Sequence, residues 1–259
     1  MKNNYQYLKV AIAAAKDSGK IFKKYFGHPQ HIKKKHGDPK NLVTEVDVRI
    51  EKNIKKLINK KFPSHGFLGE ETGWEDIKKR QYNWIIDPID GTSNYIQGIP
   101  MCCISVALWD KQGPLVGVIY NPLTNQLFSA GRGLGAYLNN GRISVSGVKK
   151  AAEGLGGLGW SLQIPKAIKM YQTIMPDIRK ARAFGTTALQ LAYVSSGIYD
   201  FYIVNDMHIW DVAAGILLIK EAGGKVTDWQ GKQPGFDVKE LVASNGKVHQ
   251  KFLNLVKKI

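Results

Sequence analysis

Trp84-Ile85-Ile86-Asp87-Pro88-Ile89-Asp90-Gly91-Thr92 joins an apolar run to two carboxylates and then to a glycine. The apolar run predicts a buried strand, and Pro88, which has no N–H to donate, predicts the end of its pairing. Gly91, Thr92 and Ser93 are typical of a helix start. Two acids and free helix N–H groups are therefore expected at one strand end. Carboxylates attract Mg²⁺ and a helix start attracts phosphate, so this stretch favours phosphoryl chemistry.

The composition is that of a globular protein with a full-size core. The chain has 259 residues, 44% hydrophobic and 22% charged, which allows one large domain or two small ones. It contains no run of about 18 apolar residues, so we expect no membrane span. The apolar segment Leu8–Ala15 lies within residues 4–26, whose apolar residues follow helical spacing. This spacing favours an amphipathic helix over a signal peptide.

The chain is strongly basic, with a net charge of +16. Its lysines are spread out and no block of five or six like charges occurs. This favours a solvated basic surface that steers anionic substrates, and leaves a nucleic-acid footprint as the alternative. The only cysteines, Cys102 and Cys103, are adjacent in an apolar segment. We expect them to be buried thiols and not a disulfide, in agreement with a cytoplasmic protein.

The first part of the chain predicts helices and then a series of strands. Residues 4–26 and 46–61 are predicted helices, and His28–Asn41, which is basic and rich in Gly and Pro, is a predicted mobile loop. The turn Asn139-Asn140-Gly141 is a strong hairpin signal. The strands are predicted at 104–109, 115–120, 126–130, 136–138 and 143–145.

The second part alternates strands and helices. Strands are predicted at 155–160, 181–184, 199–204, 225–229 and 240–244, with helices at 165–180, 186–196, 211–222 and the C-terminal end. The boundary falls near residue 147. We therefore expect an α+β unit, residues 1–147, containing an antiparallel meander, and an α/β unit, residues 148–259. Together they should form two sheets layered between helices, with the site between the two halves.

Acidic residues recur at predicted strand ends and helix starts. Glu70 and Glu71 follow an apolar pair, Asp87 and Asp90 lie in the opening stretch, and Asp211 opens a helix. Each has a plainer alternative: Glu70 and Glu71 as a solvated turn, and the aspartates as helix caps. His208, close to Asp211, is expected to be a partly buried structural histidine because no ligand spacing surrounds it. Several acids at such positions together favour a site over separate structural roles.

The sequence resembles the inositol monophosphatase family of magnesium-dependent, lithium-sensitive phosphatases. Four blocks are similar and occur in the family's order, and shorter similarities lie at Gly135–Asn139 and Gly185–Thr187. The resemblance therefore spans nearly the whole chain. It implies a layered α-β-α-β-α sandwich of the sugar phosphatase type and a homodimer. The four blocks are Asn41–Asp47 (NLVTEVD), Gly69-Glu70-Glu71, Trp84–Tyr95 and Trp210–Gly224 (WDVAAGILLIKEAGG).

The resemblance also implies a role for each matching residue. Glu70, Asp87 and the Ile89 carbonyl would bind a first Mg²⁺, and Asp87, Asp90 and Asp211 a second, while Glu70 with waters would bind a weaker third. Phosphate would bind the N–H groups of Gly91 and Thr92. Thr92, oriented by Asp47, and Glu70 would position the attacking water. The alcohol would meet Gly185, Thr186 and Thr187, together with Asp90 and Asp211.

The same resemblance implies a phosphomonoesterase acting on a small phosphorylated alcohol, with inositol 1-phosphate as the family default. Alternative substrates used by relatives are NADP, fructose 1,6-bisphosphate, 3′-phosphoadenosine 5′-phosphate and histidinol phosphate. A different class of function, an RNA- or transcription-complex-binding regulator on the same fold, is motivated by the basic charge. Val204 stands where the family carries a sugar-binding glutamate. If residue 204 faces the alcohol, recognition of inositol should be weaker here. Gln97 also departs from the family pattern, beyond the metal ligands.

Overall fold

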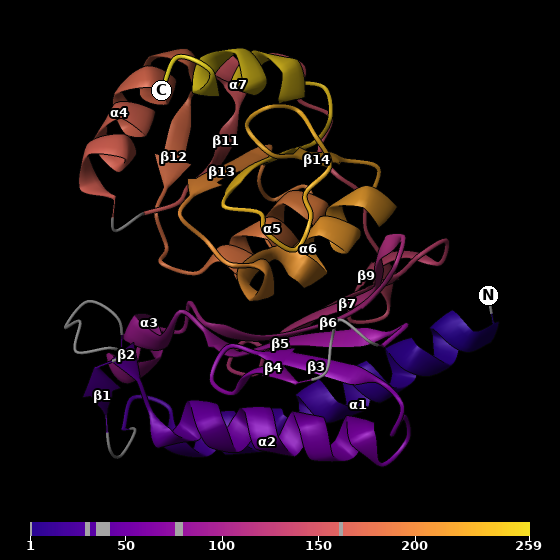
Figure 1. The fold of residues 1–259 in the computed structure, drawn as a ribbon. Helices are drawn as coiled ribbons and strands as arrows, with labels where there is room; N and C mark the ends of the chain where they lie inside the picture. The colour runs from indigo at the N-terminus through magenta and orange to yellow at the C-terminus, as the bar shows by residue number, and fades with distance from the viewer. Residues whose placement is uncertain (1, 29–31, 35–41, 76–79, 161–162) are drawn as a thin grey trace.

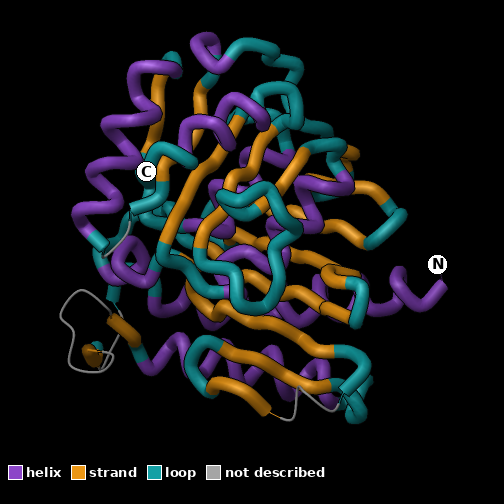
Figure 2. The backbone as a smooth tube through the Cα atoms, turned by 45° about the horizontal axis from the view of Figure 1, so that its top comes forward, coloured by secondary structure: helices purple, strands orange, loops and turns teal. Residues whose placement is uncertain are grey.

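A computed structural model of the chain describes residues 2–28, 32–34, 42–75, 80–160 and 163–259. Figure 1 shows five layers in the order helices, sheet, helices, sheet, helices. One pair of helices separates an eight-stranded sheet from a five-stranded sheet, and a further pair of helices covers the outer face of each sheet. Figure 2 shows the same layers from a tilted view. The expected α-β-α-β-α sandwich, with two sheets between helices, is confirmed.

The first outer layer consists of α1 (Lys2–Tyr25) and α2 (Glu45–Asn59), at the bottom of Figure 1. The apolar face of α2 is buried, as its helical spacing predicted. Thr44 caps this helix, because its hydroxyl accepts the Val46 N–H at 3.1 Å and Asp47 accepts the Thr44 N–H at 2.8 Å. Both helices pack with one face of the large sheet in an apolar cluster that includes Phe22, Ile50 and Trp84.

The eight-stranded sheet has the order β10-β9-β8-β7-β6-β5-β3-β4. Strands β5 to β10 form the predicted antiparallel meander, whereas β3 runs parallel to β5. A separate two-stranded ribbon pairs β1 (Lys33–Lys34) with β2 (Leu42–Val43). The strands of the large sheet are β3 (Gly66–Gly69), β4 (Gly73–Glu75), β5 (Asn83–Asp90), β6 (Cys103–Asp110), β7 (Gly113–Asn121), β8 (Gln126–Gly131), β9 (Gly135–Leu138) and β10 (Gly141–Arg142).

Strand β5 does not end at Pro88, so that prediction is wrong. Asp87 pairs with Ser105 and Asp90 pairs with Cys103, and the register shifts between these two pairs. The irregularity accommodates the missing proline N–H, because a bulge is one of the places where a strand tolerates proline. The strand therefore delivers both carboxylates at its own end before α3 (Thr92–Ile96) begins.

The middle layer consists of α5 (Thr187–Ser195) and α6 (Ile209–Glu221). Both helices are apolar on nearly every side, which is expected of helices enclosed between two sheets. Their cluster joins residues from both halves of the chain, including Leu68 and Ile119 of the large sheet and Tyr202 of the small one. Helix α6 ends before Gly223, whose φ of +87° suits the predicted glycine cap.

The five-stranded sheet has the order β12-β11-β13-β15-β14 and is mixed. Strand β11 runs parallel to β12 and β13, and β15 runs antiparallel to β13 and β14. The last layer consists of α4 and α7, which pack on the outer face of this sheet. The apolar cluster between them includes Phe201 of the sheet and Phe252 of α7. These elements are β11 (Leu155–Leu158), α4 (Ile164–Ile174), β12 (Lys180–Arg182), β13 (Phe201–Asn205), β14 (Lys225–Thr227), β15 (Glu240–Ser244) and α7 (His249–Val256), with short 3₁₀ turns at Ala151–Glu153 and Met175–Asp177.

Two further element predictions need correction. The second arm of the hairpin is β10 at Gly141–Arg142, and residues 143–145 lie outside any strand. The helix expected over 165–180 ends at Ile174, because Pro176 cannot continue it and a 3₁₀ turn follows. The other predicted helices and strands are confirmed within a few residues, as are the two buried thiols.

Three expectations have a more limited outcome. Most of the predicted loop His28–Asn41 falls on residues 29–31 and 35–41, outside the described residues. The division of the chain at residue 147 stays a prediction. Across the described ranges, no helix is both long and apolar enough to cross a membrane.

Candidate active site

The carboxylates of Asp87, Asp90 and Asp211 meet where β5 ends and α6 begins. Each offers one oxygen, and these oxygens lie within 4.8 Å of one another. Asp87 and Asp90 are almost fully buried, and Asp211 is half-buried in the first turn of its helix. The fold thus brings three of the predicted metal ligands, from two distant parts of the sequence, close enough to share a small cation.

The electrostatics of Asp87 show how crowded this cluster is. Burial raises the pKa of Asp87 well above its usual range, and the charges of Glu70, Asp90 and Asp211 raise it further, as does a hydrogen bond with Glu70. Like charges held together in a buried place disfavour ionisation. A divalent cation among them would reverse this effect, because it favours every carboxylate in its charged form.

Asp90 also binds the N-terminal end of α5. Burial raises the pKa of Asp90, and hydrogen bonds oppose this shift. The donors include the Thr186 hydroxyl, the Thr187 N–H at 3.0 Å and the Ala188 N–H at 2.9 Å. Free N–H groups at a helix start stabilise a negative charge. Asp90 therefore ties the end of β5 to the middle helix layer.

Glu70 follows β3, the strand beside β5. Its backbone N–H donates to the Ile86 carbonyl at 3.1 Å, which continues the parallel pairing by one residue. The side chain is close enough to Asp87 to raise the pKa of that carboxyl. The structure therefore places Glu70 beside Asp87.

Gly91 has a backbone conformation that only glycine adopts readily. Its φ is +89°, and a Cβ there would lie 3.0 Å from the Met101 carbonyl oxygen and 3.2 Å from that of Gly185. The Gly185 loop, expected on the alcohol side, is thus in close contact with the start of α3. Asn94 reinforces this contact, because its amide donates to the Met101 carbonyl at 2.7 Å and to the Phe184 carbonyl at 2.6 Å.

The hydroxyl of Thr92 lies between two oxygen acceptors. It is 3.0 Å from the Ile89 carbonyl oxygen and 3.5 Å from Oδ1 of Asp47. Asp47 is fully buried, and its other oxygen accepts the N–H and hydroxyl of Thr44. The carbonyl of Ile89 keeps a second lone pair beyond this bond. The predicted Thr92 therefore contacts both Asp47 and Ile89, which lies between Asp87 and Asp90 in the sequence.

The two threonines predicted for the alcohol side are also engaged with the protein. Thr186 is 2% exposed, and its hydroxyl is bonded to Asp90. The Thr187 hydroxyl lies 3.2 Å from the hydroxyl of Tyr202. Both hydroxyls are therefore bonded within the protein, and their place beside the alcohol stays a prediction.

Two expectations at the far side of the site require correction. Val204 is 3% exposed and lies in the apolar cluster between the sheets, against Gly159. Weaker recognition of inositol was expected only if residue 204 faces the alcohol. The Val204 side chain packs in the core instead, so this expectation no longer has a basis. His208 is exposed, not partly buried, and stacks on Trp210 at 4.5 Å. The backbone N–H of His208 donates to Asp211 at 2.7 Å, so Asp211 caps α6 from the third position of the helix, while His208 and not Asp211 is the N-cap residue.

Two residues with clear positions here were not singled out from the sequence. Asn94 bridges segments that are far apart in the chain, and its type carries no signal for that role. Glu51 is a fully buried carboxylate on α2, one helical turn after Asp47. An acid on the apolar face of a predicted amphipathic helix is unusual, and this could have drawn attention to Glu51.

Comparison with known proteins gives consistent matches over the full chain. Residues 3–259 match the inositol monophosphatase family. An inositol-1-monophosphatase of Mesorhizobium japonicum is 36% identical, over 97% of this chain and 96% of that protein. A fructose-1,6-bisphosphatase/inositol-1-monophosphatase of Aquifex aeolicus is 36% identical, over 100% and 98%. The Nus factor SuhB of Pasteurella multocida is 32% identical, over 96% and 95%.

A solved structure gives the same match in three dimensions. The extragenic suppressor protein suhB from Bartonella henselae superposes with a TM-score of 0.92 at 34% identity, covering 98% of this chain and 99% of that one.

Proposed function

Because the chain belongs to the inositol monophosphatase family, we propose that it is a Mg²⁺-dependent phosphomonoesterase that hydrolyses a small phosphorylated alcohol. The observation that carries this proposal is the group of three carboxylate oxygens, from Asp87, Asp90 and Asp211, within 4.8 Å of one another. The chain as a whole has a net charge of +16. A buried concentration of negative charge in such a chain is costly unless a cation neutralises it.

The residues present fit a hard divalent cation. All the side-chain donors are carboxylate oxygens, the ligands that Mg²⁺ prefers, and the crowding that raises the pKa of Asp87 is the kind that a cation relieves. Glu70, Asp87 and the Ile89 carbonyl would hold one ion, and Asp87, Asp90 and Asp211 a second, with Glu70 serving a weaker third. When bound, such ions neutralise phosphate charge and make water acidic enough to attack near neutral pH.

The other residues of the site supply positioning. The N–H groups of Gly91 and Thr92 would bind the phosphate oxygens, and this is supported by the forced conformation of Gly91 at the start of α3. The Thr92 hydroxyl, with Asp47 behind it, and Glu70 would hold the attacking water in line with the phosphorus. Positioning and neutralisation of charge account for most of what phosphoryl transfer requires.

The substrate is proposed at the level of its class. Inositol 1-phosphate is the first candidate because it is the family default, and the names of two relatives include it. Fructose 1,6-bisphosphate also appears in the name of one relative. NADP, 3′-phosphoadenosine 5′-phosphate and histidinol phosphate complete the set. Gly185, Thr186 and Thr187, together with Asp90 and Asp211, would contact the alcohol. The homodimer and the cytoplasmic location belong to this proposal as well.

A panel of these phosphate esters, assayed for phosphate release, tests the proposal and identifies the substrate. We expect turnover of one or more esters with Mg²⁺ and inhibition by Li⁺ at about millimolar concentration, as the family resemblance implies. No release from any ester of the panel at saturating Mg²⁺ would contradict the proposal.

A second candidate function is a role in a transcription complex. It is favoured by the similarity to proteins named Nus factor SuhB and by the net charge of +16. The two functions are separable by one variant. Asp87→Asn should abolish phosphate release and leave any binding of RNA unchanged, because the Asp87 carboxylate is buried and is not part of the protein surface.

A further inference from the structure

The carboxylate of Glu51 is completely buried on α2, one turn after Asp47. A buried charge is costly unless it is paired and hydrogen-bonded. Here both conditions are met, because the ammonium of Lys55 lies 3.2 Å from Oε1 of Glu51, and the Lys55 side chain is only 12% exposed.

Besides Lys55, Glu51 has hydrogen-bond donors in the turn that contains Glu70. Oε2 accepts the N–H of Glu71 at 2.8 Å, and Oε1 accepts the N–H of Thr72 at 3.2 Å. Oε1 also accepts the Thr72 hydroxyl. One side chain of α2 therefore fixes two successive backbone N–H groups immediately after Glu70.

The residue before Glu70, Gly69, lies against the same carboxylate. A Cβ on Gly69 would lie only 2.0 Å from Oε1 of Glu51, so the end of β3 approaches Glu51 as closely as a glycine allows. Glu70 itself is bonded through its N–H to the Ile86 carbonyl. The backbone of Glu70 is thus fixed from both sides, with its side chain against Asp87.

We propose that Glu51 is a positioning residue for Glu70: it holds the Gly69–Thr72 turn so that the Glu70 carboxylate stays beside Asp87 as a metal ligand. This role rests on the proposed function. Two acids on the buried face of α2 would then support the site. Asp47 contacts Thr92, and Glu51, one turn further along the helix, holds the turn that follows Glu70.

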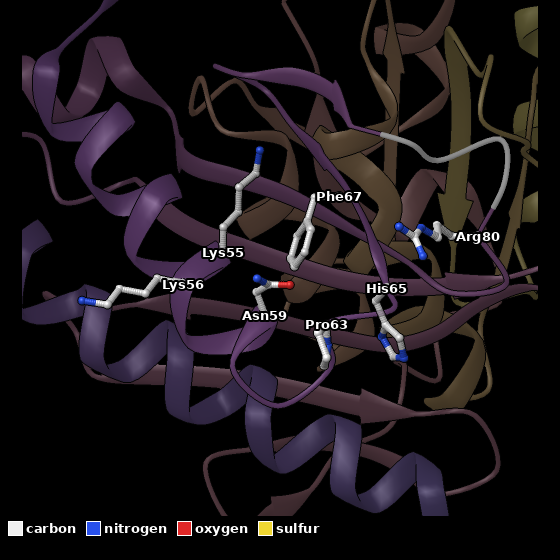
Figure 3. A pocket seen from close by; sticks show the side chains of 7 residues that line it. All are labelled: Lys55, Lys56, Asn59, Pro63, His65, Phe67 and Arg80. Carbon is white, nitrogen blue, oxygen red and sulfur yellow. The ribbon is translucent and has the colours of Figure 1, made fainter.

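Lys55 completes the arrangement. Figure 3 shows Lys55 extending from α2 alongside Phe67 of β3, whereas Lys56, the next residue, points away. Besides its ion pair, the Lys55 ammonium donates to the Thr72 hydroxyl. Its positive charge compensates Glu51, so the turn is held by a carboxylate that adds no net negative charge next to the acidic cluster. Lys56 therefore offers a matched control on the same helix.

The test compares Glu51→Gln with the wild type in two measurements: the rise in unfolding temperature on adding Mg²⁺, and the Mg²⁺ concentration at half-maximal turnover. Gln keeps the size of the side chain but replaces one acceptor oxygen by a donor. We expect the half-saturating Mg²⁺ concentration to increase about tenfold or more, as for other residues that support metal ligands. The Mg²⁺-induced rise in unfolding temperature should shrink accordingly. Glu153→Gln, the same substitution at an exposed residue, should change neither value.

Two milder variants keep the inference testable if Glu51→Gln does not fold. Thr72→Val removes an exposed residue's hydroxyl, and Lys55→Met removes the cation. Each should shift the Mg²⁺ response in the same direction by a smaller factor, whereas Lys56→Met should not. A role in stability alone would lower the unfolding temperature equally with and without Mg²⁺. Variants with a wild-type Mg²⁺ response would overturn the role of Glu51. A wild type with no Mg²⁺ response in either measurement would overturn the proposed function itself.

Discussion

At the scale of single residues, the candidate site is defined by carboxylates whose negative charges repel one another unless a cation lies among them. The repulsion is clearest at Asp87, because the charges of Glu70, Asp90 and Asp211 all raise the pKa of its carboxyl. Its Oδ1 also accepts the Ile89 N–H at 3.1 Å, a bond that an amide oxygen at the same place could keep.

Asp87→Asn should therefore separate stability from metal binding. In excess chelator the variant should unfold at a temperature no lower than that of the wild type, because one of several clustered negative charges is gone. The rise in unfolding temperature on adding Mg²⁺ should be largely lost. Thermal unfolding with and without Mg²⁺ measures both effects. Asp237→Asn, at an exposed position, should behave as the wild type. A wild-type Mg²⁺ response in Asp87→Asn would show that Asp87 binds no metal.

Thr92 provides a second test at this scale. Thr92→Val keeps the shape of the side chain and removes the hydroxyl that lies 3.0 Å from the Ile89 carbonyl and 3.5 Å from Asp47. If this hydroxyl orients the attacking water, kcat should fall about 100-fold, an effect typical of a group that handles a proton in the reaction. Thr92→Ser, which keeps the hydroxyl, should retain most of the activity. Equal kcat values for Thr92→Val and the wild type would exclude the role.

At the scale of elements, the junction between β5 and α3 depends on the left-handed conformation of Gly91. Gly133 has a similar φ, +76° against +89°, but a Cβ on Gly133 would meet nothing within 4 Å. Comparing alanine substitutions at these two glycines separates the free-energy cost of the left-handed backbone from the cost of a clash with neighbouring atoms.

Gly133→Ala should destabilise the fold by about 1–2 kcal/mol and leave kcat unchanged. Gly91→Ala should cost more, because its Cβ meets two carbonyl oxygens at 3.0 and 3.2 Å, and should also lower kcat by displacing the start of α3. Urea unfolding and phosphate release measure the two effects. Similar losses of stability with full activity in both variants would contradict a specific role for Gly91.

The last layer contains a buried histidine that should make stability depend on pH. His249, at the start of α7, bonds Ser244 of β15 through Nδ1 at 2.9 Å and Thr227 of β14 through Nε2 at 3.0 Å. Burial, and to a lesser degree Lys225, lower the pKa of His249 to about 4 from 6.5. Between about pH 6.5 and pH 4 the unfolded chain therefore binds a proton that the folded chain does not, and stability falls as the pH falls.

His249→Gln should reduce this dependence. The shift in urea midpoint between about pH 7 and about pH 5 should be smaller in the variant than in the wild type, since a glutamine takes up no proton on unfolding. Part of the dependence should persist, because burial lowers the pKa of His65 to about 4 as well. Identical shifts in both proteins would show that His249 contributes nothing to the pH dependence.

At the scale of the whole molecule, the layered fold brings the site together from two parts of the chain. Asp87 and Asp90 come from the large sheet and Asp211 from the middle helices. Local patterns predicted these elements well, because apolar periodicity and caps act over a few residues. The stretch Trp84–Thr92 predicted a buried strand and a helix start, and the structure has both, although the strand continues through the two acids.

What the sequence could not predict depends on contacts between distant segments. Pro88 was expected to end β5, but the bulge opposite β6 accommodates it. The buried bonds of Glu51 reach a turn some twenty residues away along the chain, and no local pattern records them. The burial of Val204 follows from the packing of β13 against the middle helices, which counting back from Asp211 cannot show.

The most direct test of metal-dependent hydrolysis at this carboxylate cluster is phosphate release from the best substrate of the panel, measured on one preparation with Mg²⁺, with excess chelator and after Mg²⁺ is restored. We predict turnover with Mg²⁺, loss of turnover in chelator and full recovery, with Asp87→Asn inactive throughout, since loss of a catalytic metal removes several kcal/mol, to order of magnitude, of transition-state stabilisation. Undiminished phosphate release in excess chelator, or wild-type release by a folded Asp87→Asn variant, would contradict it.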